Sequence, residues 1–337
     1  MTTAWSMPPE WAPQDRIWMA FPPAGYTLGD TPEEQAEGRE CWAAVANAIV
    51  RFEPVTMVVD PSDAAIAREL LDPAIDLVEA PLDDAWMRDI GPTFVIGSDG
   101  RLGGVDWVFN GWGAASWSTW EKDALVAERV CAAAGVERID SPMINEGGGI
   151  HVNGAGTVMV TRTVQLGEGR NSDWTQAQVE AELLRTIGAD HVIWLERGLT
   201  RDYDEFGTRG HVDIVATFCD EVTVLYHDQR NPEHPDFEVS AQVRATLEGH
   251  DLTLIPVPAP DTLSDDEGWV DYSYINHLVV NDGVILCAFD DPGDERAAEI
   301  MRAAYPGREV VLVDARPIFA RGGGIHCITQ QQPRSQA

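Results

Sequence analysis

Short apolar runs typical of β-strands alternate with helical segments along this chain, and the alternation restricts the fold to the α/β class. Residues 55–59 are predicted to form a buried strand and residues 63–71 a helix. Further strands are expected at residues 93–96, 157–161, 192–195, 214–218, 222–226, 252–257, 277–280, 284–288 and 309–313. Further helices are expected at residues 121–134, 175–187, 239–248 and 295–305. Because no linker or low-complexity segment interrupts the pattern, we expect a single domain over residues 1–337.

One internal repeat adds to this picture. The run GGGIH occurs at residues 147–151 and again at residues 322–326, each time between two apolar, strand-like runs. Polar positions at Asp89, Glu146, His211, Tyr274 and Cys327 follow one another at intervals of about 60 residues. This spacing predicts five similar modules around a pseudo-symmetry axis, each offering one polar residue to a common centre.

Composition narrows the class of partner. A formal net charge of −33 repels nucleic-acid phosphates and anionic membranes, whereas it attracts cationic small molecules; solubility or a salt-rich host would explain the same charge. The most apolar stretch, residues 41–50, is much shorter than the roughly 18 residues of a membrane span. The N-terminus lacks a signal-peptide pattern, and the five cysteines form no C-x-x-C motif. We therefore expect reduced thiols in a cytoplasmic protein that binds neither nucleic acid nor membrane.

Cys327 is the cysteine most suited to chemistry. It follows three glycines and precedes a polar run, whereas Cys41, Cys131, Cys219 and Cys287 lie in apolar runs typical of structural cysteines. Glycine lets the backbone approach a ligand closely, so this thiol is predicted to be accessible. A buried structural cysteine is the alternative.

His211 and Asp213 lie two residues apart in Gly-His-Val-Asp. If this segment is a strand, both side chains face the same side, as general acid–base catalysis would require. A core histidine satisfied by its neighbour is the alternative. A metal pair would need a third ligand such as His151 or His326, but both fit a structural role inside the glycine repeat better.

Two further carboxylates complete the candidate set. Asp89 precedes Ile-Gly-Pro, and Glu146 stands just before the first triple glycine. Three carboxylates do not suit peptide hydrolysis, which develops a negative oxyanion, but they suit a planar, cationic guanidinium. A thiol assisted by an imidazole can attack the central carbon of that group.

Six segments of the chain resemble the agmatine deiminases, within the guanidine-modifying (pentein) superfamily that also contains arginine and bacterial peptidylarginine deiminases. They are residues 86–92, 105–113 (VDWVFNGWG), 146–157, 210–218, 271–276 and 322–333, and they occur in the family's order over nearly the whole chain. The last segment, with IHCITQQQP, is the most specific. The resemblance implies a five-bladed α/β propeller formed by one catalytic domain.

Position by position, the resemblance assigns the nucleophile to Cys327 and the acid–base histidine to His211. It assigns the guanidinium-binding aspartates to Asp89 and Asp213 and the histidine-supporting glutamate to Glu146. Trp86 and Trp112 are candidates for the walls of the substrate site; core packing is the alternative for both and is favoured for Trp112. The family's reaction needs no metal or organic cofactor, and its members often form homo-oligomers.

Departures from the family pattern affect the identity of the substrate. They fall at Arg321, Gly324 and Ile214, and in the segment around Arg162. Agmatine is the expected guanidine substrate, with free or peptidyl arginine or a related metabolite as the alternative. Arginine would need a cation for its carboxylate, which Arg162, Arg209 or Arg321 could supply. A guanidine- or polyamine-binding protein without catalysis and a metal hydrolase that uses His151, His211 and His326 are the remaining alternatives.

Overall fold

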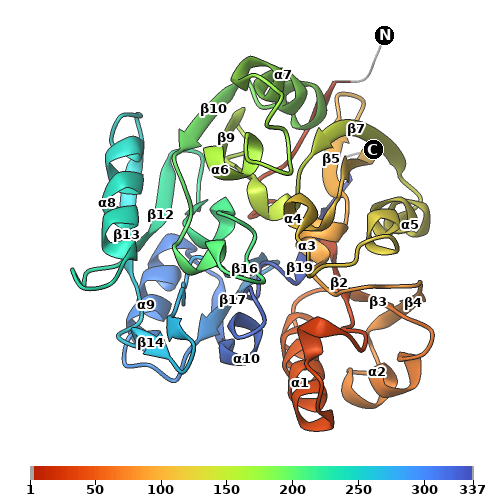
Figure 1. Ribbon diagram of the computed structural model, residues 1–337. Helices are drawn as coiled ribbons and strands as arrows, with labels where there is room; N and C mark the ends of the chain where they lie inside the picture. Colours follow the sequence, from red (N-terminus) through yellow and green to blue (C-terminus); the bar gives the residue numbers. More distant parts are fainter. Residues whose placement is uncertain (1–3, 336–337) are drawn as a thin grey trace.

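Five sheets of three or four strands, together with a two-stranded ribbon, make up the β-structure of residues 4–335, the part that this computed structural model describes (Figure 1). The strands of the sheets are β1 (Trp5–Ser6), β5 (Thr93–Gly97), β6 (Leu102–Val108) and β7 (Glu137–Ile144); β8 (His151–Val152), β9 (Thr157–Thr161) and β10 (His191–Leu195); β11 (Ala216–Phe218), β12 (Thr223–Asp228) and β13 (Thr253–Pro258); β16 (Leu278–Val280), β17 (Gly283–Ala288) and β18 (Glu309–Asp314); and β19 (Thr329–Pro333), β2 (Gln14–Ala20), β3 (Val55–Val59) and β4 (Asp76–Glu79). The ribbon pairs β14 (Ser264–Asp265) with β15 (Gly268–Trp269).

All five sheets contain one pairing pattern, in which a central strand has an antiparallel partner on one side and a parallel partner on the other. The parallel connections contain the longer helices, as such crossovers require. The helices are α1 (Pro32–Ile49), α2 (Ala64–Leu70), α3 (Met87–Ile90), α4 (Gly111–Ala114), α5 (Val126–Ala134), α6 (Arg162–Gln165), α7 (Gln176–Ile187), α8 (Asp236–Leu247), α9 (Asp294–Ala304) and α10 (Arg316–Phe319).

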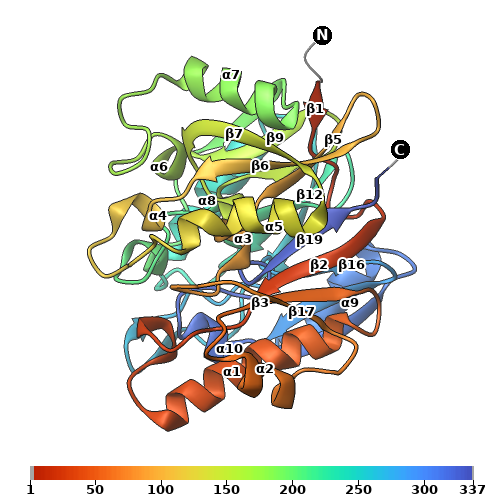
Figure 2. The same ribbon diagram turned by 90° about the vertical axis from the view of Figure 1, so that its right-hand side faces the viewer.

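The two ends of the chain meet in one sheet. β2 lies between β19 and β3, and Figure 2 shows these three strands side by side. Asn281 ties the start of β2 to the neighbouring module, since its Oδ1 accepts from the Gln14 N–H at 3.1 Å and its Nδ2 donates to the Gln14 carbonyl at 2.9 Å. Because β19 begins just after Cys327, this pairing also fixes the segment that carries the thiol.

Local sequence signals explain the helix boundaries. Thr31 and Thr175 cap α1 and α7 through reciprocal hydrogen bonds with Glu34 and Gln178, respectively. Gly135 ends α5 in the left-handed conformation, with φ of 68°. The helix α1, which the sequence reading did not anticipate, has both its capping box and a proline in its first turn.

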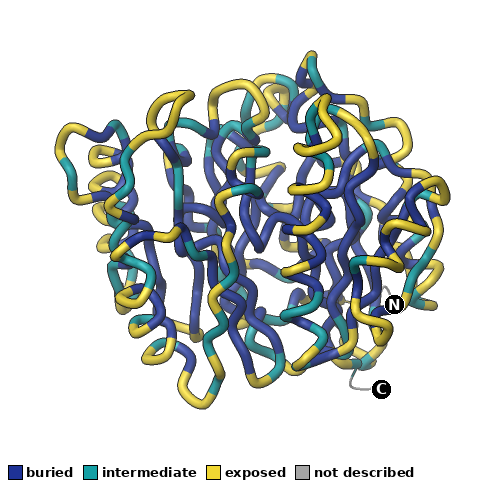
Figure 3. The backbone as a smooth tube through the Cα atoms, turned by 90° about the horizontal axis from the view of Figure 1, so that it is seen from below, coloured by how far each residue is buried: buried dark blue, intermediate teal, exposed yellow. Residues whose placement is uncertain are grey.

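The apolar core forms two clusters. The larger contains residues from Ile17 to Ile328, and the smaller joins the sheets of β5–β7 and β8–β10 with helix α7. Figure 3 shows buried segments running through the interior and exposed ones mainly in the peripheral loops and outer helices. The chain thus buries its sheets and leaves helix surfaces and loops in contact with solvent.

Two expected elements differ in detail. The helix expected over residues 121–134 is a 3₁₀ turn at Asp123–Leu125 followed by α5. The strand expected over residues 214–218 is wrong at its start, because Val212–Ile214 forms a 3₁₀ turn and β11 begins only at Ala216. Asp202 holds the segment just before this turn, since its carboxylate accepts hydrogen bonds from the backbone N–H groups of Gly210 and His211, which are then not available to a neighbouring strand.

Within residues 4–335, no helix combines the length and the apolar character needed to cross a membrane.

The side chains of Leu183 and Leu184 test the role of the smaller core cluster. Leu183 on α7 is fully buried, whereas Leu184 is 52% exposed. We expect Leu183→Ala to lower the free energy of unfolding by about 2–5 kcal/mol because it leaves a cavity. Leu184→Ala, the matched control, should change it by less than about 0.5 kcal/mol. Denaturant titration of both variants measures the difference, and equal effects would contradict the assigned burial.

Candidate active site

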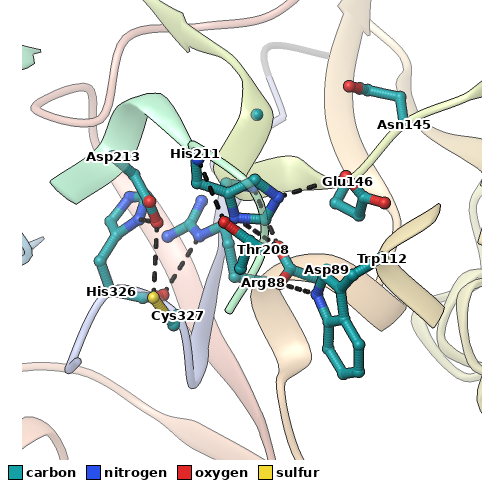
Figure 4. A network of polar contacts seen from close by, with 12 residues as sticks. Arg88, Asp89, Trp112, Asn145, Glu146, Thr208, His211, Asp213, His326 and Cys327 are labelled. Atoms are coloured by element: carbon teal, nitrogen blue, oxygen red, sulfur yellow. Dashed lines mark hydrogen bonds and ion pairs between the residues drawn. The ribbon is translucent and has the colours of Figure 1, made fainter. Parts of the chain in front are cut away.

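The Cys327 thiol lies in a buried polar centre (Figure 4). Its Sγ is 3.2 Å from Nδ2 of Asn276 and 3.7 Å from Oδ2 of Asp213. The preceding glycines make room for this arrangement, since a Cβ at Gly324 would collide with the Asn276 amide and one at Gly323 would press on Trp86 and Cys327. The glycine run therefore lets other segments approach the thiol closely.

Asp213 presents one occupied and one free oxygen. Its Oδ2 accepts a hydrogen bond of 2.7 Å from Nδ1 of His326, while its buried Oδ1 has no hydrogen-bond partner among residues 4–335. Burial alone would raise the pKa of this carboxyl, but the hydrogen bond and charge of His326 and the charge of His211 lower it. Asp213 is therefore an ionised, partly unsatisfied carboxylate.

Asp89 faces the same centre from α3. Trp112 Nε1 donates to its Oδ2 at 2.9 Å, and the Gly148 N–H donates to its Oδ1 at 3.1 Å. The pKa of Asp89 is raised to about 6, because burial and the carboxylates of Glu146 and Asp213 raise it by more than the charge of His211 and the Trp112 hydrogen bond lower it. No arginine contact compensates this carboxylate within the described residues, so it is the site's least neutralised acid.

His211 lies between two acids, as Figure 4 shows. Its Nε2 is 3.2 Å from Oε2 of Glu146, and its Nδ1 is 3.9 Å from Oδ1 of Asp89. Arg170 Nε in turn donates to both oxygens of Glu146 at 3.0 Å. Burial would lower the pKa of His211, but Asp89 and Glu146 raise it to about 9. Burial would raise the pKa of Glu146, but Arg170 and His211 lower it to about 2.

The backbone around His211 explains how these groups meet. A Cβ at Gly148 would collide with the His211 ring and come 3.1 Å from Oδ2 of Asp213, so only glycine allows this approach. The expectation that His211 and Asp213 share one strand face is wrong, because a 3₁₀ turn at Val212–Ile214 carries Asp213. The turn nevertheless brings both side chains to the centre.

The two candidate tryptophans are both buried. Trp86 packs edge-on against Trp42 at 5.4 Å between ring centroids, and its ring lies so close to Gly323 that a Cβ there would come within 2.6 Å of it. Trp112 stacks on Trp117 at 5.4 Å and donates to Asp89. Trp112 thus has a polar contact with the site that core packing alone would not produce.

Several buried polar residues at the centre were missed by the sequence reading. Asn276, rather than the marked Tyr274, reaches Cys327; the Tyr274 hydroxyl donates instead to Asp294. Arg170 and Glu10 stand next to Glu146 and His326. Only Asn276 had a signal in the sequence, because it ends the polar run at residues 272–276.

The expected metal alternative does not assemble. His151 and His326 do meet at Glu10, but His211 is held elsewhere by Glu146. The guanidinium of Arg88 lies 3.5 Å from the same Glu10 carboxylate and already supplies a positive charge there. These residues suit a network of charged hydrogen bonds better than a cation site.

The chain matches the Porphyromonas-type peptidyl-arginine deiminase family over residues 6–333. A Streptomyces coelicolor protein, provisionally named an agmatine deiminase, is 57% identical over 336 residues that cover 98% of this chain and 99% of the relative. The agmatine deiminase of Ectopseudomonas mendocina is 38% identical, with 98% and 96% covered. The solved agmatine deiminase of Enterococcus faecalis has a TM-score of 0.91 at 32% identity, with 98% and 96% covered. The mixed α/β fold is therefore that of the agmatine deiminase structures.

The charge state of His211 is directly testable. With a pKa of about 9 the ring remains protonated at neutral pH, so its contribution to stability is complete below its ordinary value of 6.5 and is lost as pH rises through about 9. Glu146→Gln should lower the pKa of His211 by about one unit or more. Titration of the ring signals by NMR measures this shift.

Glu53→Gln provides the control, since it removes a buried carboxylate that contacts Asn281 outside the site. Its His211 titration should match that of the parent protein. A His211 pKa near 6.5 in the parent protein would contradict the assigned pairing.

Proposed function

The chain belongs to the Porphyromonas-type peptidyl-arginine deiminase family, and on that premise we propose that it hydrolyses agmatine to N-carbamoylputrescine and ammonia through a covalent intermediate on Cys327. The observation that carries the proposal is the convergence of one thiol with the carboxylates of Asp89 and Asp213 in a buried centre. A guanidinium is planar, cationic and able to donate to both carboxylates at once.

Two buried polar atoms without hydrogen-bond partners in the described part of the chain support this binding mode. Oδ1 of Asp213 and Nδ1 of His211 are buried without hydrogen-bond partners among residues 4–335. A guanidinium between Asp89 and Asp213 would satisfy the carboxylates and place its carbon about 3–3.5 Å from the sulfur. Asp89 and Asp213 then act as the substrate-binding acids, and Trp86 and Trp112 as side walls.

The charge of the substrate also activates the nucleophile. Burial raises the pKa of the Cys327 thiol well above its ordinary value, and Asp213 and Asp89 raise it further. A bound guanidinium neutralises these carboxylates and stabilises the thiolate, so the thiol releases its proton to water as the substrate enters and takes one up again when the product leaves. The resting thiol is therefore protected until the substrate is in place.

His211 supplies the proton transfers. The thiolate attacks the guanidinium carbon, and protonated His211 gives its proton to the departing nitrogen, which leaves as ammonia. The S-alkylthiouronium that remains is attacked by water, whose proton neutral His211 accepts, and the sulfur leaves as the ureido product forms. Glu146, held by Arg170, keeps His211 oriented and charged between turnovers. The chemistry uses water and side chains without a cofactor.

Two observations favour agmatine over free arginine. Arg162 pairs with Glu196 and Arg321 with Glu37, so two of the three candidate cations are already engaged by acids, whereas Arg209 donates to the Glu168 carbonyl. A cavity of about 250 Å³ beside Gly322 and Phe206 is lined by five acids, Asp202, Asp204, Glu205, Glu267 and Asp271, against one cation, Arg201, which pairs with Glu267. Such a surface suits the amine end of agmatine and repels the carboxylate of arginine.

The proposal extends to the architecture. Five sheets with one pairing pattern, closed by β19 on β2, support a five-bladed α/β propeller with pseudo-fivefold symmetry. We treat residues 1–337 as one catalytic domain, of which residues 1–3 and 336–337 lie outside the described part. Because the mechanism needs a reduced thiol, we expect the enzyme to work in the cytoplasm on its small cationic substrate.

A substrate panel tests the specificity. We expect ureido product and ammonia from agmatine, with kcat/KM at least about a hundredfold higher than for free arginine or a blocked arginine ester, since arginine brings an unpaired carboxylate to an acidic surface. A colorimetric assay for the ureido group measures all three. If the enzyme prefers either arginine compound, that compound is its substrate and the assignment of agmatine is wrong.

Substitution of the nucleophile tests the mechanism. Cys327→Ala should abolish turnover without unfolding the protein. Cys131→Ala, which removes a buried cysteine outside the site, should leave turnover intact. Acid quench of the parent enzyme during turnover should yield, by mass spectrometry, a protein heavier by agmatine minus ammonia. Parent-level activity in Cys327→Ala would refute covalent catalysis, and binding of agmatine without any turnover would identify a binding protein instead.

A further inference from the structure

A chain of buried charges reaches Asp213 from the side opposite its free oxygen. Nδ1 of His326 is 2.7 Å from Oδ2 of Asp213, and Nε2 of His326 is 2.8 Å from Oε1 of Glu10. Both contacts have hydrogen-bond length, and all three side chains are buried, with 3%, 2% and 4% exposure for His326, Asp213 and Glu10. Glu10 comes from the segment before β2, so residues far apart in the sequence form this chain.

The geometry determines the protonation state. A neutral imidazole has one N–H, but here both ring nitrogens face carboxylate oxygens, which accept and do not donate when ionised. Burial would raise the pKa values of Glu10 and Asp213, but His326, assisted by Arg88 at both acids and by His211 at Asp213, brings the net shift of both downward, so both are ionised. Burial and Arg88 would lower the pKa of His326, but Glu10 and Asp213 raise it. His326 is therefore an imidazolium that donates to two acids.

We propose that His326, held as an imidazolium by Glu10, is a positioning residue that keeps Asp213 ionised and turns its free oxygen toward the guanidinium. The inference rests on the proposed deiminase function, because Asp213 is there a substrate-binding acid. Neither His326 nor Glu10 needs to touch the substrate. The proposed hydrogen-bond chain Glu10–His326–Asp213 thus acts through the carboxylate at its end.

Comparison of the two substrate-binding aspartates supports this role. Among residues 4–335, no cation lies within hydrogen-bond distance of Asp89, and its pKa is raised to about 6, whereas that of Asp213 is lowered in the same buried centre. The two pKa values shift in opposite directions because an imidazolium, His326, is hydrogen-bonded to Asp213. With Asp213 already charged, only Asp89 must lose its proton near neutral pH before a guanidinium can bind.

The surrounding charges are consistent with this assignment. His326 faces Asp213, Glu10 and Arg88, with the His151 ring 6.3 Å away and His277 also nearby. Asp213 faces His326, His211, Arg88, Asp89 and the Cys327 thiol. Arg88 Nη1 lies 3.5 Å from Glu10, and its backbone N–H donates to the Cys327 carbonyl at 3.1 Å. His326 and Arg88 therefore both compensate the negative charges of Glu10 and Asp213, and His326 is the cation in hydrogen-bond contact with both.

The variant His326→Asn tests the charge separately from the hydrogen bond. The asparagine amide can still donate to Asp213 from near the position of Nδ1, but it carries no charge. We expect the pKa of Asp213 to rise into the range of Asp89, so two acids must then ionise before substrate binds. The acidic limb of log kcat/KM against pH should steepen from a slope of one to a slope of two.

The loss of kcat/KM in His326→Asn should also depend on pH, and it should arise mainly from weaker substrate binding. Relative to the parent enzyme, kcat/KM of His326→Asn should fall about tenfold further at pH 5 than at pH 8, mainly through KM, because an acid with a pKa of about 6 is mostly protonated at pH 5 and ionised at pH 8. Glu10→Gln should shift the profile in the same direction by a smaller amount. His277→Asn is the matched control, since buried His277 bonds through Nδ1 to the Tyr274 carbonyl and its lowered pKa keeps it neutral. Its profile should have the shape of the parent profile.

NMR of the parent protein provides a readout that does not need turnover. Both ring nitrogens of His326 should carry protons from pH 5 to pH 8, and Glu10→Gln should lower the pH at which one is lost. A neutral His326 ring at pH 7, or a loss in His326→Asn that is equal at pH 5 and pH 8, would overturn the inference. If the parent protein does not convert agmatine but its His326 is protonated, the proposed function fails while the charge assignment stands.

Discussion

Four buried carboxylates can remain charged at the centre of this protein because four cations are packed against them. Glu10, Asp89, Glu146 and Asp213 face Arg88, Arg170, His211 and His326, and all eight side chains are buried. An unpaired buried charge costs several kcal/mol, so these groups depend on one another and on the segments that supply them. This balance of charge determines the chemistry that the centre can support.

The four carboxylates are not equally well paired with cations, and this difference matters for substrate binding. Glu146 has two close cations, and Asp213 is hydrogen-bonded to His326, but the cation paired with Asp89 in the described part of the chain is the more distant His211 ring, at 3.9 Å. A cationic substrate completes the pairing of Asp89 and at the same time relieves the repulsion that keeps Cys327 protonated. Binding and activation of the nucleophile are therefore one electrostatic event in the proposed mechanism.

The glycine repeat permits this density of charge. Gly148 lets the His211 ring approach the backbone beside Asp89, and Gly324 lets the Asn276 amide reach the sulfur. A side chain at either position would separate groups whose interaction decreases with distance. The two glycine runs, far apart in the sequence, thus allow opposite sides of one centre to approach.

The sequence by itself determined the α/β class and about half of the strands and helices, because strand and helix patterns are local. It also singled out the thiol, the imidazole and three carboxylates, through their motifs and the family resemblance. It could not reveal Arg170, Glu10 or the role of His326, whose partners are distant in the sequence, and it assigned His211 and Asp213 to a strand that Asp202 prevents. Tertiary structure alone decided which acid meets which cation and hence which groups are protonated. The physical reason is that a pKa depends on burial and on neighbours within a few ångströms, and folding brings those neighbours together.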